Sequence, residues 1–324
     1  SDRATICMPF HRLLDVLEEN RLADKKYGST RRGIAPVYAD KYRKKSLRMG
    51  DLLSPDTLRE KLENIISWEN LLVRAYGREA IDAQAMYDWL MRCGEPLLGH
   101  ICDTTVYLEE AARAGKNILF EAQLGALRDI DYGIYPYTTS SQTLAAYAPI
   151  GAGLPGAKLN LVIGVVKAYS SCVGEGPFTV EMSGDEAEAL RAAGGEYGAA
   201  TGRPRRVGAF DIPASRYGVL VQGVDEIALT KLDVMAYMDK IPVCVAYEVD
   251  GVRTDRFPSG DELLRAKPVY EYLEGFQTDI SQCRRKEDLP LAAIRYIQFI
   301  EKAMGCPIKY VSVGAERDDY LLMY

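Results

Sequence analysis

The pattern of apolar and polar positions predicts a mainly helical beginning to this chain. Apolar residues recur every three or four positions in several segments, which places them on one face of an α-helix. These segments are HRLLDVLEENRLA near the start and, within residues 50–116, LREKLENIISWENLLVRAYG, AIDAQAMYDWLMRCGEPLLGHI and TTVYLEEAARAG. Two stretches rich in basic residues or glycine, 25–48 and 149–157, are predicted to be loops.

After residue 116, short apolar runs alternate with helical patterns. The runs predicted as strands are NILFE (117–121), LNLVIGVVKAY (159–169), EIALTKLD (226–233), IPVCVAYEV (241–249) and IKYVSVG (308–314). Helical spacing returns in DEAEALRAAG, with a predicted capping box from Ser183 to Glu186, and in LPLAAIRYIQFIEKAMG. Strands that alternate with helices predict an α/β fold with a large, mainly parallel sheet flanked by helices. We expect one domain over residues 1–324, with a mainly helical subregion at 50–116 and the sheet core at 117–324.

Composition and charge narrow the class of protein. The 324 residues carry a formal net charge of −6, and the sequence pI of about 5.3 argues against a general nucleic-acid-binding surface. The seven cysteines are scattered without a CxxC pair, which is typical of reduced thiols rather than of disulfides or a zinc site. No apolar run approaches the length of a membrane span. We therefore expect a cytoplasmic protein with neither nucleic-acid nor membrane partners.

Candidate chemistry begins where the predicted strand EIAL ends, in Thr230-Lys231-Leu232-Asp233. This stretch is close to [NT]KxD, in which the carboxylate accepts hydrogen bonds from N1–H and the 2-amino group of guanine together. Ligands of parallel sheets bind at the carboxyl ends of strands. Alone, the four letters fit an exposed polar strand end equally well. The last predicted strand ends in Ser312-Val313-Gly314, where a second contact to the base is expected, and the two strand ends together favour a guanine site.

Three glycine-containing loops carry further candidate chemistry. TGRPRR places Arg203, Arg205 and Arg206 close together in a chain that is acidic as a whole. The segments GSTRRGIAP (28–36) and DIDYGIYPYTTSSQ (129–142) combine hydroxyls, glycine and arginine, which suit phosphate oxygens. Each loop alone is also consistent with ordinary turn chemistry or with a solvated basic turn.

Taken together, these motifs resemble the adenylosuccinate synthetase family from residue 1 to the end of the chain. The matching stretches, in the order of the family, are GSTRRGIAPVYADK, NILFEAQLGALRDIDYGIYPYTTSSQ, GVVKAYSSCVGEGPF, EYGAATGRPRRVGAFD, LTKLDV and VSVGAERD. The resemblance implies a homodimer with a P-loop-GTPase-like α/β sheet, here without the first strand and the phosphate loop, and with a helical insertion. It implies a GTP- and Mg²⁺-dependent ligase that places the γ-phosphate on O6 of IMP, after which the L-aspartate amine displaces it.

The resemblance also assigns ligands to residues of this chain. The aspartate carboxylates would be held by Thr201, Arg203 and Arg205, and the planar guanidinium groups suit a dicarboxylate. The guanine of GTP would be read by Lys231, Asp233, Ser312 and Gly314. The IMP site would comprise Thr30, Lys44, Thr139, Val173, Gln123 and Leu124, with Lys44 directed to the IMP phosphate of the partner subunit. Arg206 is expected to have a structural role.

One departure from the family pattern is an absence. The family's GDEGKGK loop supplies the general-base Asp, a phosphate-binding Lys and a magnesium ligand, and a catalytic His follows it; this sequence has none of these. Gly115-Lys116 follows a predicted helix and precedes a predicted strand, the wrong order for a phosphate loop. His11 and His100 are expected to be structural. We therefore expect no catalytic residue and no metal ligand on this chain, which by itself would be inactive; the Mg²⁺ ligands would belong to an N-terminal segment.

The other departure lies in the predicted IMP site. Leu124 stands where the family has the glutamine that contacts the base, unless a shift of one residue lets Gln123 replace it. Other family residues are replaced by Arg31, Tyr132, Gln142, Tyr147, Cys172 and Ala200. Three hypotheses remain open: a ligase for IMP and aspartate, the same chemistry on another purine nucleotide or amine, and a nucleotide-binding protein without catalysis.

Overall fold

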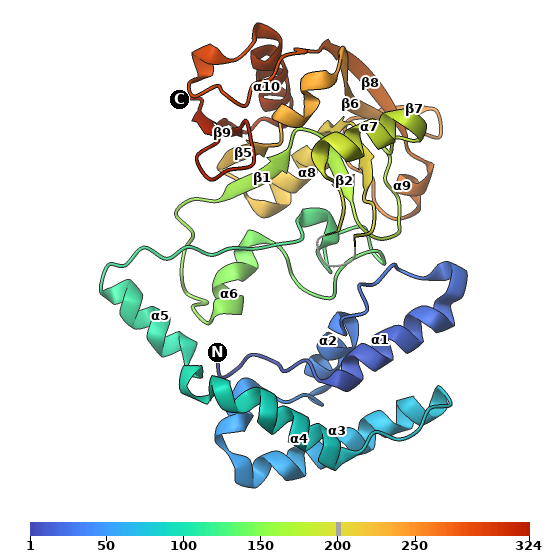
Figure 1. Cartoon of the computed structure of the whole chain (residues 1–324), viewed down its shortest axis with the longest axis vertical. Helices are drawn as coiled ribbons and strands as arrows, with labels where there is room; N and C mark the ends of the chain where they lie inside the picture. The colour runs from blue at the N-terminus through green and yellow to red at the C-terminus, as the bar shows by residue number, and fades with distance from the viewer. Residues whose placement is uncertain (199–201) are drawn as a thin grey trace. The chain divides into compact units, whose positions relative to one another are not determined.

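The computed structural model describes residues 1–198 and 202–324, and the chain forms two compact units. Unit 1 comprises Ser1–Leu124, Asp129–Asp131 and Pro136–Lys158, and unit 2 comprises Gly125–Arg128, Tyr132–Tyr135 and Leu159–Tyr324. Both units can be followed in Figure 1. The expectation of one domain over the whole chain, with subregions divided at residue 116, stays a prediction.

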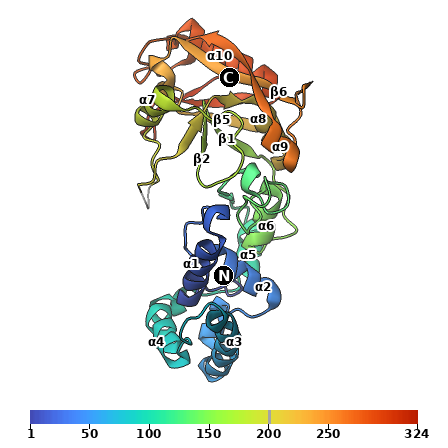
Figure 2. The ribbon, with the colours of Figure 1, turned by 90° about the vertical axis from the view of Figure 1, so that its right-hand side faces the viewer.

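Unit 1 is helical among its described residues. Its elements are α1 (Pro9–Leu22), η1 (Ala23–Lys25), α2 (Ile34–Arg43), η2 (Met49–Leu53), α3 (Pro55–Ala75), α4 (Ala83–Gly94), η3 (Glu95–His100), α5 (Thr104–Arg113), η5 (Ala145–Tyr147) and α6 (Ala148–Ala152). Helix α1 packs against α2 and α3 packs against α4, and both pairs are visible in Figure 2. The periodic patterns therefore predicted α1, α3, α4 and α5 correctly.

A core of large aliphatic side chains holds these helices together. Leu58, Leu62, Ile66 and Val73 lie on one face of α3 and are almost fully buried, together with Leu90 of α4. Their spacing of four or seven residues creates this apolar face, and burying one such side chain contributes about 1.5–3 kcal/mol.

Three local predictions in unit 1 are wrong. The basic segment 25–48 and the glycine-rich segment 149–157 are not entirely loops, because they contain α2 and α6. NILFE (117–121) is not a strand: residues 116–123 have no regular secondary structure, and the Leu119 side chain is 91% exposed. An apolar run forms a strand only where a neighbouring strand takes its backbone hydrogen bonds, and these residues pair with none of the described strands.

Unit 2 contains the sheets. Its strands are β1 (Ile163–Lys167), β2 (Ser170–Cys172), β3 (Arg206–Gly208), β4 (Phe210–Asp211), β5 (Glu226–Thr230), β6 (Lys240–Val249), β7 (Val252–Thr254), β8 (Lys267–Glu274), β9 (Ile308–Ser312) and β10 (Tyr320–Leu322). One sheet has the order β1-β5-β9-β10, in which the first three strands are parallel. A second joins β4 to β6 in parallel and adds β7 and β8 antiparallel to β6, and β2 pairs with β3. The predicted α/β class is confirmed, with mixed sheets whose parallel strands are flanked by helices.

Helices cover these sheets and complete the core of unit 2. They are η4 (Ala126–Arg128), α7 (Gly184–Gly194), α8 (Ile212–Gln222), η6 (Asp233–Tyr237), α9 (Asp261–Arg265), η7 (Lys286–Asp288) and α10 (Leu291–Met304). Helix α8 packs on β6 and on α10, and the buried Ile297 and Ile300 of α10 join Ile227 and Leu229 of β5 in one cluster. The predicted capping box of α7 does not form, because the Ser183 side chain caps no backbone N–H. None of the described helices combines the length and hydropathy needed to span a membrane.

Candidate functional site

The carboxyl ends of three neighbouring parallel strands bring the predicted guanine-reading residues together in unit 2. Strands β1, β5 and β9 lie side by side, so Lys167, Thr230 and Ser312 end adjacent strands. Asp233 follows β5 as the first residue of η6. One of its carboxylate oxygens, Oδ1, is buried and has no hydrogen-bond partner among the described residues. Burial raises the pKa of Asp233 against the lowering effect of the nearby Lys231 charge. A buried carboxylate oxygen without a donor is suited to a ligand that brings one.

The two other predicted contacts have defined local geometry. Lys231 has a left-handed backbone (φ 60°), a conformation that costs a non-glycine residue about 1 kcal/mol. Its ammonium donates to the Gly194 carbonyl at 2.6 Å, at the end of α7. The Ser312 hydroxyl donates to the Gly314 carbonyl at 2.8 Å, and an added Cβ at Gly314 would clash with the Asp319 carboxylate. A side chain at this position would therefore have to displace the Asp319 carboxylate.

A buried glutamate underlies the arginine loop. Glu196 is fully buried, and its Oε1 accepts hydrogen bonds from the Lys167 ammonium (2.7 Å) and the Tyr169 hydroxyl (2.5 Å). Its Oε2 accepts one from the Arg205 guanidinium at 2.9 Å, and its backbone carbonyl accepts the Arg205 N–H. Burial alone would raise the pKa of Glu196, but Lys167, Tyr169 and Arg205 outweigh burial and hold the pKa below its usual value. The carboxylate is thus kept ionised between two cations.

The sequence interpretation missed Glu196, Lys167 and Tyr169. Lys167 could have been predicted from the sequence, because it ends a parallel strand, where ligand-binding residues gather. Glu196 gave no local signal, since its burial comes from contacts with residues 29 and 27 positions away.

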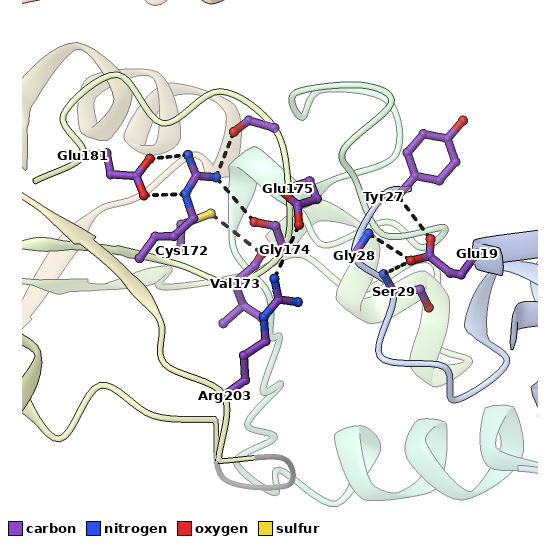
Figure 3. Close-up of polar contacts among 12 residues, drawn as sticks. Glu19, Tyr27, Gly28, Ser29, Cys172, Val173, Gly174, Glu175, Glu181 and Arg203 are labelled. Atoms are coloured by element: carbon purple, nitrogen blue, oxygen red, sulfur yellow. Dashed lines mark hydrogen bonds and ion pairs between the residues drawn. The ribbon is translucent and has the colours of Figure 1, made fainter. Parts of the chain in front are cut away.

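The three arginines of TGRPRR have different partners, and Figure 3 labels Arg203 with its neighbour Glu175. Arg206 donates two hydrogen bonds to Glu181, at 2.8 and 2.5 Å, and one to the Gly176 carbonyl at 2.8 Å. Arg203 lies 3.4 Å from the exposed Glu175 carboxylate. The expected structural role of Arg206 fits these contacts, which tie β3 to the segment that contains Val173. Thr201 and Ala200 lie outside the described residues.

In unit 1, the two predicted phosphate loops touch each other. The rings of Tyr27 and Tyr137 meet edge to face with their centroids 6.2 Å apart, which brings the loops of Thr30 and Thr139 together. The Thr139 hydroxyl lies 3.4 Å from the Ser141 hydroxyl. Thr30 is exposed and makes no hydrogen bond to a described residue, so its hydroxyl and N–H are available to a ligand.

Buried Asp129 shapes the second of these loops. Its Oδ1 accepts the Asp131 N–H at 2.9 Å and its Oδ2 accepts the Thr143 N–H at 2.6 Å. The two ends of the loop that carries Thr139 are therefore held by one carboxylate.

The remaining predicted IMP residues are exposed and are divided between the units. Lys44 (φ 62°) ends α2 and Leu124 (φ 74°) follows Gln123, all three in unit 1. Residues 116–123 have no regular secondary structure, so Gln123 does not lie on a strand. Val173 lies in unit 2, where its carbonyl accepts a hydrogen bond from Arg128 at 2.8 Å.

The two histidines lie in different surroundings. The Nδ1 atom of buried His11 accepts the Met8 N–H at the start of α1, so the protonated Nε2 faces Asp40 at 3.1 Å. His100 is exposed at the end of η3. Among residues 1–198 and 202–324, no three His, Cys, Asp or Glu side chains cluster as ligands of a metal ion.

Comparisons with known proteins identify the family. The adenylosuccinate synthetase family model matches residues 1–321. An adenylosuccinate synthetase of Synechococcus sp. (strain CC9902) is 46% identical over 322 residues, which cover 99% of this chain and 73% of that protein. The solved structure of a fully ligated adenylosuccinate synthetase from Plasmodium falciparum has a TM-score of 0.94 at 33% identity and covers all of this chain and 77% of its own.

A more distant structure shares the fold. The succinoaminodeoxyadenylate synthetase of cyanophage S-2L, bound to dGMP and dATP, has a TM-score of 0.53 at 17% identity, a likeness that extends to the fold alone. The match over almost the whole chain and the identity to the Synechococcus protein are decisive: the chain belongs to the adenylosuccinate synthetase family.

Proposed function

We propose that this chain carries the guanine, aspartate and nucleotide sites of a GTP-dependent ligase of purine biosynthesis. The ligase joins IMP and L-aspartate into adenylosuccinate, with release of GDP and phosphate, through a 6-phosphoryl nucleotide. The observation that carries this proposal is the buried, unpartnered oxygen of Asp233 at the end of β5, beside Lys231 and Gly314.

Guanine is the base that suits Asp233. An ionised carboxylate only accepts hydrogen bonds, and guanine offers N1–H and a 2-amino group side by side, whereas adenine does not. Lys231 is held at its tip by the Gly194 carbonyl, so its methylene stem is available to cover the face of the base. Ser312 and Gly314 supply polar backbone at the neighbouring strand end.

Aspartate is assigned to the loop of Thr201, Arg203 and Arg205. Two guanidinium groups match the two carboxylates of the substrate. Glu196 supports this role because one of its carboxylate oxygens accepts a hydrogen bond from the Arg205 guanidinium. The Arg205 side chain remains 30% exposed. Glu175 offers Arg203 a carboxylate at 3.4 Å that a substrate carboxylate would replace.

The nucleotide phosphate is assigned to Thr30 and Thr139, and the base to the region of Gln123 and Leu124. Lys44 would serve the phosphate of a partner subunit in a cytoplasmic homodimer. Mg²⁺, when bound, would neutralise charge on the GTP phosphates.

Calorimetric titration of the protein with GTP, ATP and XTP tests the guanine assignment. We expect GTP to bind at least tenfold more tightly than ATP. Asp233→Asn should weaken GTP binding by about 10–100-fold and favour XTP, because hydrogen bonds to a charged group contribute about 1.5–3 kcal/mol. Asp318→Asn, an exposed carboxylate in the loop after β9, is the matched control. Unchanged GTP selectivity in Asp233→Asn would remove this residue from the base site.

A panel of acceptor nucleotides separates the ligase from its alternatives. IMP, GMP and dGMP are each titrated, and each is then incubated with GTP, Mg²⁺ and aspartate while the condensed product is measured. We expect IMP to bind most tightly. A preference for GMP or dGMP would indicate that the altered residues around Leu124 recognise a nucleotide other than IMP. Binding of GTP and IMP without product would favour the alternative of a nucleotide-binding protein without catalysis.

A further inference from the structure

The backbone of the first phosphate loop is bound to a buried carboxylate of helix α1. Glu19 is only 5% exposed, and its Oε1 accepts the Tyr27 N–H at 3.1 Å. Its Oε2 accepts the N–H groups of Gly28 and Ser29, each at 3.1 Å (Figure 3). Three successive backbone donors thus point inward to one side chain, much as they would surround a bound anion.

A second carboxylate, one turn earlier on α1, holds the rest of the loop. Asp15 is 4% exposed, and its Oδ1 accepts the Ser29 hydroxyl at 2.7 Å while its Oδ2 accepts the Gly33 N–H at 2.8 Å. The Ser29 hydroxyl oxygen in turn accepts the Arg31 N–H at 3.0 Å. The spacing of four residues places Asp15 and Glu19 on the same face of the helix, under the two halves of the loop.

Neither carboxylate forms an ion pair within the described residues. A buried anion without a cation is expensive, and here it is stabilised by backbone N–H groups and one hydroxyl alone. Such an arrangement leaves the loop little freedom, because moving it would leave a buried charge unsatisfied. The hydrogen bonds also use up the inward donors of residues 27–29, 31 and 33.

The polar groups of the loop that these carboxylates do not bind belong to exposed residues. Thr30 keeps both its hydroxyl and its N–H, and the side chains of Thr30, Arg31 and Arg32 are all exposed. Arg31 has φ 57°, the left-handed conformation that glycine adopts most easily, so the loop turns sharply where its cation emerges. The loop therefore has one face occupied by carboxylates and one face of free donors and cations.

We propose that Glu19 and Asp15 are positioning residues for the phosphate of the acceptor nucleotide, acting through the backbone of residues 27–33. They occupy the inward donors, so a phosphate dianion can bind only at the outer face formed by Thr30 and the exposed guanidinium groups. This inference rests on the proposed function of the loop, and it goes further by naming the residues that shape it.

Titration of the protein with IMP and with inosine tests this proposal, since the two ligands differ only in the phosphate. Glu19→Gln keeps the shape of the side chain but turns one acceptor oxygen into an NH₂ group that opposes a backbone N–H. We expect IMP to bind at least tenfold more weakly to this variant, with inosine affinity unchanged within about twofold. Glu18→Gln is the matched control, because Glu18 faces Arg21 and Tyr76 instead of the loop.

The outcomes separate the inference from the function on which it rests. If the unaltered protein binds IMP no more tightly than inosine, the proposed function of the loop fails. If it prefers IMP and Glu19→Gln retains that preference, the positioning role is overturned. Equal weakening of IMP and inosine would also overturn it, because a merely structural residue affects both ligands. Should Glu19→Gln not fold, Ser29→Ala decides: it removes only the links to Asp15 and Arg31, and an unchanged preference for IMP would again contradict the proposal.

Discussion

Two loops of this chain stand over buried glutamates, and the two glutamates are satisfied by different donors. Glu19 in unit 1 accepts three backbone N–H groups and no cation. Glu196 in unit 2 accepts hydrogen bonds from the side chains of Lys167, Tyr169 and Arg205. Both carboxylates are almost inaccessible to water.

The difference shows two ways of preparing a site for an anion. Backbone donors tie the path of the chain to the carboxylate, so Glu19 fixes the course of its loop. Side-chain donors leave the path free and fix the cations instead, so Glu196 determines where Arg205 stands. A phosphate can be bound by backbone and hydroxyl groups, whereas a dicarboxylate is held best by guanidinium groups.

The largest change in the free energy of unfolding is expected from Glu196→Gln. The change leaves Lys167 and Arg205 side by side without their anion, and breaking a buried ion pair from one side costs on the order of 3 kcal/mol. Urea denaturation at pH 7 measures the free energy of unfolding, with Glu188→Gln on the exposed face of α7 as control. Because the pKa of Glu196 is lowered in the folded protein, the loss should be full above the ordinary glutamate range and should disappear as the pH falls below it. A loss that is independent of pH would contradict the ionised state of Glu196.

A second prediction concerns a buried glutamate of unit 1 with an opposite pH dependence. Burial, reinforced by the Asp40 charge and opposed by Arg43, raises the pKa of Glu69 to about 7. Its contribution to stability is therefore present below the unfolded pKa and is lost as the pH rises through about 7. Glu69→Gln should remove this loss and stabilise the protein at pH 8 by on the order of 2 kcal/mol.

Urea denaturation between pH 5 and pH 8 measures this effect. Glu63→Gln, an exposed position on the same helix α3, should leave the pH dependence unchanged. A lower stability of Glu69→Gln at pH 8 would mean that this carboxylate is ionised and paired, as Glu196 is.

Arg203 and Arg206, both in the TGRPRR loop, are expected to differ in their effects on binding and on stability. Arg203→Leu should weaken aspartate binding at least tenfold, about 1.4 kcal/mol, with an unchanged free energy of unfolding. Arg206→Leu should lower the free energy of unfolding by about 1–2 kcal/mol, because it leaves Glu181 and the Gly176 carbonyl without their donor. Calorimetry and urea denaturation of both variants measure the two quantities. Equal effects of the two changes on both quantities would argue against a binding role for Arg203 that is separate from a structural role for Arg206.

The smallest effect is expected at the turn of the first loop. Arg31→Gly should raise the free energy of unfolding by about 1 kcal/mol, because φ is 57° there and glycine adopts this conformation without strain. It should also weaken IMP binding if the exposed guanidinium contacts the phosphate. Thermal denaturation and calorimetry measure both, and a destabilised variant would show that the Arg31 side chain supports the loop.

Much of the fold and part of the site could be predicted from local sequence. The apolar spacing of α3 and α10 predicts them because one face of each is buried, and Lys231 and Asp233 follow β5 as the TKLD pattern indicates. The NILFE strand was wrong because a strand depends on a partner that the run itself does not specify. Glu19 and Glu196 could not be predicted as loop supports, since each looks like any other glutamate until tertiary contacts bury it.

The most direct test of this account is a crystal structure of the protein with GDP, IMP and L-aspartate. We predict the guanine edge within hydrogen-bond distance of Asp233, the aspartate carboxylates on Arg203 and Arg205, and the IMP phosphate on the outer face of the Thr30 loop. Glu19 should keep its three backbone hydrogen bonds in that complex. A phosphate bound in place of the Glu19 carboxylate, or ligands away from these residues, would contradict the account.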